Sequence, residues 1–133
     1  MFTERTYRTQ FNTERFSGFE VDYKETDLWI GVDPVSFKTE MKEVALSKIK
    51  SLRENLDNYI KEEPFFKKSL KPFQTSDDAP PEAKEMAAAA EKAGIGPMAV
   101  VAGLFAHEVG KELIQNFAVE EMIVENGGDI MQF

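Results

Sequence analysis

Between Phe37 and Ile60, apolar residues recur every three or four positions, with Lys, Glu and Arg between them. This spacing predicts one long amphipathic helix whose apolar side must be buried against another element. Pro64 follows closely and ends the helix. The charged residues between the apolar positions are typical of a solvated face. The apolar positions are Met41, Ala45, Ile49, Leu52, Leu56, Tyr59 and Ile60.

Two stretches before this helix alternate apolar and polar residues. Phe19, Val21 and Tyr23 lie in the first stretch, and the second runs from Leu28 to Val32. Alternation with a period of two predicts strands, and their closeness predicts a β-hairpin that turns near residues 25–27. A further short strand is expected from Tyr7 to Phe11.

The middle of the chain predicts a loop and two more helices. Lys71–Glu82 is rich in Pro, Ser, Thr and Asp, which is typical of a surface loop. Glu82–Ala93 is rich in alanine and is followed by Gly94, which predicts a short helix and its stop. Pro97 suits the first position of another helix, which we expect to run to about Ile114.

The last segments predict a second pair of strands. Glu120–Val124 is apolar enough for a buried strand, and Ile130–Phe133 is its expected hairpin partner. We therefore expect an α+β fold, with three helices packed on an antiparallel sheet. A length of 133 residues suits one domain, here taken as residues 1–133 with the surface loop near 71–82.

Composition excludes several classes of function. The chain has 24 acidic and 16 basic residues, a formal net charge of −8, so its field repels nucleic acids. It has no cysteine, which rules out disulfides and thiolate metal sites. We find no signal peptide and no membrane-spanning stretch, and we expect a cytoplasmic protein without a membrane partner.

Ala93–Gly110 carries small residues three or four positions apart on one side of the expected helix. Ala99, Ala102, Gly103 and Gly110 belong to this side, which permits close approach of another element. Packing against a helix or strand is favoured, and contact with a flat ligand is the alternative. At the helix start, Gly96 and Pro97 leave N–H groups that suit an anion such as phosphate.

The stretch VENGGDI, residues 124–130, supports two interpretations. Asn126-Gly127-Gly128-Asp129 is a strong signal for a tight hairpin turn, because glycine adopts positive φ at no steric cost. The same glycines suit a ligand loop, with Glu125 and Asp129 facing a cation or a hydroxyl group. His107 is the only histidine, and without an evident nucleophile it makes a hydrolase the weakest interpretation.

Together these motifs resemble an uncharacterised bacterial and archaeal family described as ApbE-like. The resemblance rests mainly on GIGPMAVVAG (residues 94–103) and VENGGDI. ETDL at residues 25–28, YIKEEPFFKKSLKPF at residues 59–73 and the pair Tyr7-Arg8 extend it over nearly the whole chain. The remote relatives of that family with known chemistry are the FAD:protein FMN transferases.

The resemblance implies a flavin nucleotide, FAD, and Mg²⁺ as cofactors, with FMN transfer or FAD cleavage in a complete chain. It implies a pocket between the small-residue helix and the glycine turn. The backbone carbonyl of Ala102 would be a metal ligand, and no catalytic residue is assigned. The implied cofactor-binding residues are Gly96, Pro97, Met98, Ala99, Gly103, Asn126, Gly127, Gly128 and Asp129.

This sequence departs from the transferase pattern at several positions. Pro97 stands in place of an aspartate, Ala99 and Val100 replace a glycine pair, and Gly103 replaces a lysine. The transferases' other metal ligands follow the Gly-Gly-Asp motif, where this chain has four residues. We therefore expect an incomplete metal site and the N-terminal part of a longer domain.

The alternative is a non-catalytic interaction module. An unpaired sheet edge and a bare helix face would then be covered by a second copy of the chain. We expect a homo-oligomer under either interpretation. Asp129 distinguishes them, because a binding site needs its carboxylate and a plain turn does not.

Overall fold

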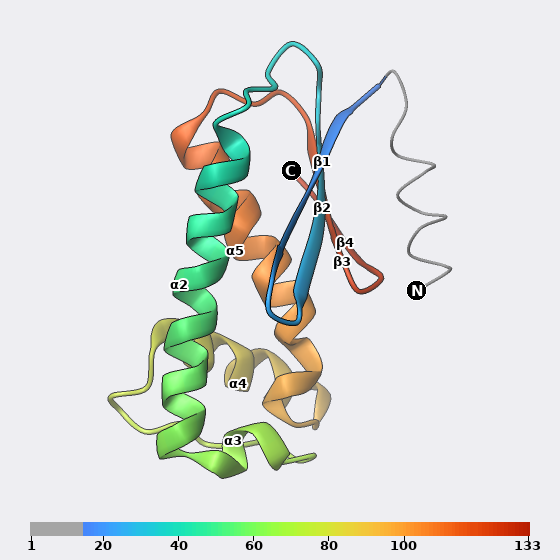
Figure 1. The fold of residues 1–133 in the computed structure, drawn as a ribbon. Helices are drawn as coiled ribbons and strands as arrows, with labels where there is room; N and C mark the ends of the chain where they lie inside the picture. Colours follow the sequence, from blue (N-terminus) through green and yellow to red (C-terminus); the bar gives the residue numbers. More distant parts are fainter. Residues whose placement is uncertain (1–14) are drawn as a thin grey trace.

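The structure, a computed structural model, describes residues 15–133, so the strand expected at Tyr7–Phe11 and the pair Tyr7-Arg8 lie outside the described residues. The described part confirms the α+β class, with four α-helices instead of the expected three (Figure 1). The elements are β1 (Ser17–Tyr23), β2 (Thr26–Val32), α2 (Met41–Glu62), α3 (Pro64–Lys68), α4 (Pro81–Ala93), the 3₁₀ helix η1 (Pro97–Val100), α5 (Val101–Asn116), β3 (Met122–Asn126) and β4 (Asp129–Gln132).

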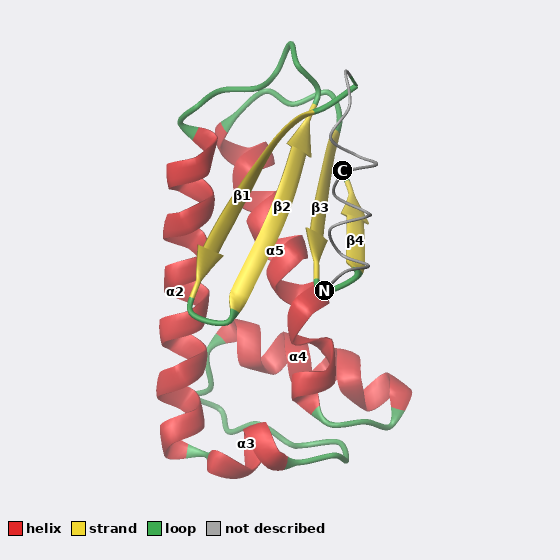
Figure 2. Cartoon of the chain, turned by 45° about the vertical axis from the view of Figure 1, so that its right-hand side comes forward, coloured by secondary structure: helices red, strands yellow, loops and turns green. Residues whose placement is uncertain are grey.

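The four strands form one antiparallel sheet in the order β1-β2-β3-β4. Its central pair joins β2 to β3, with Val32 opposite Met122, although the helices separate these strands in the sequence. Helices α2 and α5 cover one face of the sheet, and α3 and α4 lie below it (Figure 2). The architecture is therefore a sheet layer on a helix layer, with a helical extension at one end.

Both predicted hairpins are present. The first turns at Lys24 and Glu25, slightly earlier than expected, because Tyr23 pairs with Thr26. The second turns at Gly127 and Gly128, whose φ angles are 57° and 94°. Positive φ at both central residues matches the right-handed twist of the flanking strands.

The sheet separates two apolar clusters. Leu28, Ile30 and Val32 face the helices and are fully buried in the main core. On the opposite face, Trp29 packs with Phe16, Ile123 and Ile130. The indole fits because Gly18 and Gly31 lack side chains, and a Cβ at either would lie 2.5 Å from a Trp29 ring carbon.

Helix α2 buries the apolar side that its spacing predicts. It begins at Met41 rather than Phe37 and ends at Glu62, just before Pro64. Its buried residues are Met41, Ala45, Ile49, Leu52, Leu56 and Tyr59. Helix α3, which was not predicted, places Phe66 between Tyr59 and Phe73, with ring centroids 5.3 and 5.6 Å away.

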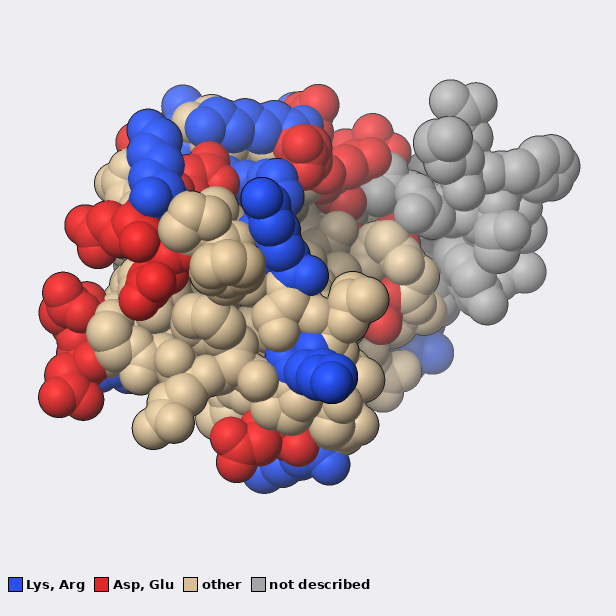
Figure 3. Space-filling view, turned by 90° about the horizontal axis from the view of Figure 1, so that it is seen from below, with Lys and Arg blue, Asp and Glu red and all other residues tan. Residues whose placement is uncertain are grey.

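Helices α4 and α5 agree closely with expectation. Helix α4 begins at Pro81, so the loop ends slightly before the predicted Glu82, and Gly94 caps the helix with φ of 70°. Pro97 starts η1, and α5 continues from it to Asn116. The end of the molecule formed by α3, α4 and η1 shows an uncharged area between basic and acidic side chains (Figure 3).

In residues 15–133, no single helix has the length and apolar character needed to cross a membrane. The pair Pro81–Ala93 and Pro97–Asn116 passes that test jointly, by length and composition only, but is bent by 99°.

The side chain of Asp33 links the loop after β2 to the segment that precedes β3 through hydrogen bonds. Its Oδ1 accepts hydrogen bonds from the N–H groups of Glu120 (3.2 Å) and Glu121 (2.9 Å), and its Oδ2 from Ser36 N (3.1 Å) and Oγ (2.8 Å). Burial raises the pKa of Asp33, but these hydrogen bonds outweigh burial and hold the pKa below its ordinary value of 3.8.

Candidate functional site

The residues predicted to bind a ligand fall in two places. Gly96 and Pro97 are buried, and a Cβ at Gly96 would lie 1.8 Å from the Ser69 carbonyl oxygen. The glycine therefore lets two stretches of backbone pack together. Met98 is half-buried and packs against the main core. The side of Gly96 on which a Cβ would lie is therefore occupied by the protein itself.

The second place brings the start of α5 against the β3–β4 turn. The side-chain Nδ2 of Asn126 donates a hydrogen bond of 3.1 Å to the Ala102 carbonyl oxygen. A Cβ at Gly103 would lie 3.7 Å from Asp129 Oδ2, its nearest neighbour. Ala102 is thus adjacent to Asn126, and Gly103 is adjacent to Asp129.

The β3–β4 turn is exposed to solvent at its two glycines and is held in place by a hydrogen bond to Glu125. Gly127 and Gly128 are exposed, and no atom lies within 4 Å of a Cβ built at either residue. Beneath them, Glu125 Oε2 accepts a hydrogen bond of 3.0 Å from Gly128 N. Glu125 is fully buried, so it supports the turn instead of facing a ligand.

We name Gly103, Asn126, Gly128 and Asp129 the α5–turn site. Asp129 and Ala99 are exposed, and Gly103 is half-exposed. Val100, the last residue of η1, and Leu104 of α5 are half-exposed apolar residues that also pack against the main core. The site therefore offers a carboxylate acceptor beside a bare stretch of helix.

Further along α5, the small residues serve packing. Ala106 and Gly110 are buried, and a Cβ at Gly110 would lie 2.1 Å from Cζ of Phe133. His107 stacks on the same ring, with centroids 6.1 Å apart and planes inclined by 23°. The described contact of His107 is with an aromatic ring and not with a nucleophile.

The described residues do not fit the predicted magnesium site. Mg²⁺ requires nearly ideal octahedral coordination by oxygen. No group of three or more His, Asp or Glu side chains in residues 15–133 is placed to hold a metal ion. The carbonyl of Ala102 accepts a hydrogen bond from Asn126, which gives it a structural role.

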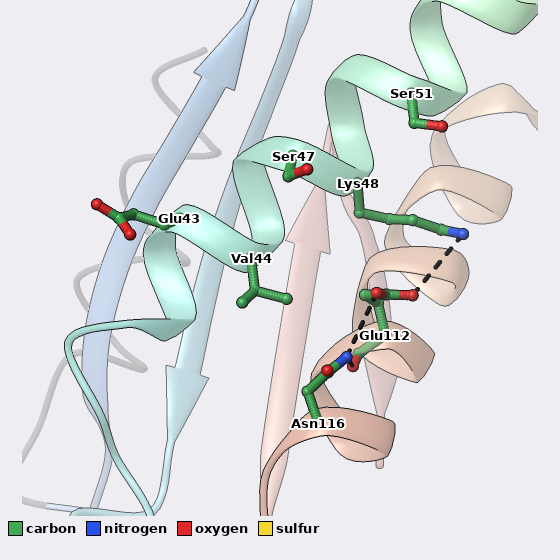
Figure 4. Close-up of a pocket in the computed structure, with 7 residues that line it drawn as sticks. All are labelled: Glu43, Val44, Ser47, Lys48, Ser51, Glu112 and Asn116. Atoms are coloured by element: carbon green, nitrogen blue, oxygen red, sulfur yellow. Dashed lines mark hydrogen bonds and ion pairs between the residues drawn. The ribbon is translucent and has the colours of Figure 1, made fainter.

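A polar groove of about 480 Å³ runs between α2 and α5 (Figure 4). Lys48 crosses it toward Glu112, with Nζ 3.9 Å from Oε1, and also lies 4.0 Å from Glu108. Asn116 bonds Glu112, and Glu43 points away from the groove (Figure 4). Because two carboxylates neutralise Lys48, the groove has no cation left for an anionic ligand.

Glu82, in the first turn of α4, is a buried carboxyl that sequence reasoning missed. It is 8% exposed, and its Oε1 has no hydrogen-bond partner among residues 15–133. Burial raises its pKa above the ordinary 4.5, against the opposing effects of a hydrogen bond from Asn55 and the charge of Lys48. Glu108 raises the pKa further. The surroundings of Glu82 thus favour its neutral form more than water does.

The fold and the α5–turn site define a small α+β domain with a solvent-facing site beside one hairpin. Comparison with known proteins identifies its family. The chain belongs to the family whose model is described as AbpE bacteria, which matches residues 8–132.

Archaeal relatives share the same region. A UPF0280 protein of Methanococcus vannielii is 42% identical over 112 residues, which cover 84% of this chain and 43% of that protein. UPF0280 proteins of Methanocaldococcus jannaschii and Methanospirillum hungatei are 39% and 46% identical over 107 and 88 residues. These matches cover 80% and 66% of this chain, and 41% and 35% of the relatives. The chain spans less than half the length of these relatives.

These findings correct the expected family. The predicted resemblance to ApbE-like proteins, with FAD:protein FMN transferases as remote relatives, is wrong, because the matches identify a UPF0280 family member. The site roles inferred from the transferases lose that support. A ligand must be argued from the geometry of the α5–turn site.

Proposed function

We propose that this domain binds a nucleotide at the α5–turn site, with FAD as the ligand to test first. The observation that carries the proposal is the pairing of Asp129 with the bare backbone of Gly103, where Asp129 Oδ2 is the nearest atom to the missing Cβ at 3.7 Å. A carboxylate beside an open stretch of helix can accept hydrogen bonds from ligand hydroxyls. Nucleotides carry such hydroxyls on their sugar or ribityl chains.

The surroundings of the pair suit this role. Asn126 holds the turn against α5, and Glu125 fixes Gly128 from below, so the site is ordered before a ligand arrives. Such preorganisation lowers the entropy lost on binding. The half-exposed Val100 and Leu104 offer apolar contact for a flat ring.

The proposal covers binding and no cleavage step. Asp129 is the one charged side chain of the α5–turn site, and its negative charge would repel phosphates placed beside it. The phosphates of a bound nucleotide would therefore point away from the turn. FAD cleavage or FMN transfer would need positive charge from elsewhere in a longer protein. The proposed location is the cytoplasm.

Titration of FAD into the protein, followed by flavin fluorescence and by calorimetry, tests the proposal. Asp129→Asn removes the charge at constant shape, and Gly103→Val fills the space beside the helix. We expect each change to lower the affinity for FAD by about tenfold or more. Asp129→Asn removes a charged hydrogen-bond acceptor, and Gly103→Val blocks access to the helix backbone. Asp22→Asn, an exposed carboxylate on β1, is the matched control and should bind as the wild type does.

Two results would overturn the proposal. One is the absence of saturable binding of FAD to the wild-type protein. The other is binding that Asp129→Asn and Gly103→Val leave unchanged. Circular dichroism of each variant separates a lost ligand contact from a lost fold.

A further inference from the structure

The end of the molecule opposite the loop of Val35 exposes large apolar side chains. Leu70 is 87% exposed, Phe65 72% and Ile95 36%. Gly96 packs directly on the backbone of Ser69 and Leu70, so the backbone of its neighbour Ile95 comes close to that of Leu70. Phe65 lies one helical turn before Ser69, whose N–H donates to the Phe65 carbonyl over 2.9 Å. We name Phe65, Leu70 and Ile95 the α3–η1 surface.

Four exposed lysines are close in sequence to the residues of this surface. In the described residues these four form no salt bridge, as is also true of Lys38 and Lys42, whereas Lys24, Lys48 and Lys111 each pair with an acidic side chain. Two exposed acidic residues, Glu62 and Glu91, precede Phe65 by three positions and Ile95 by four, and they are also outside the ion pairs of the described chain. The unpaired lysines are Lys67, Lys68, Lys71 and Lys92. Figure 3 shows this end, with basic and acidic side chains around uncharged atoms.

We propose that a second copy of this chain docks on the α3–η1 surface and forms a two-fold dimer. In a two-fold contact each copy presents the same surface to the other, so a patch with both charge signs can satisfy itself. The apolar residues of both copies would be buried at the centre. The lysines of each copy would face Glu62 and Glu91 of the other, which agrees with a polar rim around an apolar centre.

A lipid surface fits less well. The two rim carboxylates and the formal net charge of −8 would repel an anionic membrane. A second copy supplies both the apolar and the charged partners that this surface lacks. The sequence suggested self-association through an unpaired edge of the sheet. The proposed dimer uses the α3–η1 surface instead, and the edge strand β4 is short, spanning only Asp129–Gln132.

Sedimentation equilibrium over a wide range of protein and salt concentrations tests the proposal. The wild type should show a reversible monomer–dimer equilibrium that weakens as salt is added. Leu70→Ser and Phe65→Ser should each weaken the dimer by about tenfold or more, because they remove central apolar contacts. Val35→Ser is the matched control, since Val35 is also 87% exposed but lies in the loop between β2 and α2.

Charge reversal provides a second, independent arm. The variant K67E/K68E and the variant E62K/E91K should each fail to dimerise alone. Mixed together, they should form a heterodimer, because each then carries the charge that the other lacks. Circular dichroism confirms the fold of each variant.

Three outcomes would overturn the proposal. The wild type could remain a monomer at low salt and high concentration. Val35→Ser could weaken the dimer as much as Leu70→Ser. The protein could bind phosphatidylserine-containing vesicles as a monomer and lose that binding in Leu70→Ser, which would assign the surface to lipid.

Discussion

The carbonyl oxygen of Ser69 lies 1.8 Å from the point that a Cβ atom of residue 96 would occupy. The Ser69 carbonyl is a backbone group, and the position of a Cβ at residue 96 is fixed by the backbone. Rotation of a side chain therefore cannot relieve the contact. A glycine that suggested a phosphate-binding helix start therefore joins the end of α3 to the start of η1. It also sets the position of the α3–η1 surface.

Replacement of Gly96 by alanine should destabilise the fold by about 2–3 kcal/mol, because overpacking forces backbone apart. Urea denaturation measures the loss. Gly103→Ala is the matched control, since a Cβ there meets only Asp129 Oδ2 at 3.7 Å, an ordinary contact. The free energy of unfolding of Gly103→Ala should equal that of the wild type or exceed it by about 0.5–1 kcal/mol, as expected for Gly→Ala in a helix. Equal effects of the two changes would contradict the packing role of Gly96.

Asp33 should stabilise the fold at neutral pH and lose this effect in acid. Its folded-state pKa lies below the ordinary 3.8, so the stabilisation is present above the unfolded value and disappears as pH falls through the folded pKa. Asp33→Asn should cost about 2 kcal/mol at neutral pH, because an amide replaces a carboxylate that accepts four hydrogen bonds.

Urea denaturation at neutral and at acid pH measures this dependence. The difference between wild type and Asp33→Asn should shrink below pH 3.8. Asp22→Asn, at an exposed position, controls for general charge effects. A difference that stays constant with pH would show that shape, and not the charge of Asp33, fixes the loop.

Glu82 should show the opposite dependence on pH. Its folded-state pKa is raised above 4.5, so its contribution to stability is fully present below that value and is lost as pH rises through the folded pKa. Burial raises this pKa, and it outweighs a backbone hydrogen bond to the Glu82 carboxyl, the hydrogen bond from Asn55 and the charge of Lys48, which all favour the charged form. Glu82→Gln should therefore stabilise the protein at neutral pH by about 0.5–1 kcal/mol.

Thermal unfolding across pH measures this gain. The gain should vanish below pH 4.5, where Glu82 is protonated in both states. Glu85→Gln, exposed on the same helix, should change stability little at any pH. A loss of stability in Glu82→Gln at neutral pH would mean that the charged carboxylate is the form that holds α4 in place.

The sequence predicts those parts of the fold that depend on local pattern. Alternation identifies β1 and β2, and the spacing of apolar residues identifies α2, because each pattern follows the geometry of its own element. Asn126-Gly127 identifies the second hairpin, since positive φ is a local requirement.

The remaining features depend on contacts between distant residues. Asp33 bonds N–H groups 87 and 88 positions later, and no local pattern marks that pairing. Helix α3 is only five residues long, too short for a periodic signal. Gly96 looked like a ligand-binding glycine because its packing partner, Ser69, cannot be inferred from its neighbours in sequence.

The candidate site shows the same division. The glycine turn and the small residues of α5 stand out in the sequence, but the fixed pairs Asn126–Ala102 and Asp129–Gly103 are visible only in the fold. The burial of Glu125 beneath the turn was missed, because its position beside the glycines suggested an exposed ligand. In β3, Glu125 points to the sheet face that carries Trp29.

Amide chemical-shift mapping during addition of FAD tests the central claim most directly. We expect progressive, saturable shifts at Gly103, Gly127 and Gly128, with Gly18 and Gly31 on the opposite sheet face unchanged. The amides of Gly103, Gly127 and Gly128 thus report binding, and those of Gly18 and Gly31 are the control in the same spectrum. Shifts confined to the groove around Ser47 and Ser51, or no shifts at any FAD concentration, would contradict nucleotide binding at the α5–turn site.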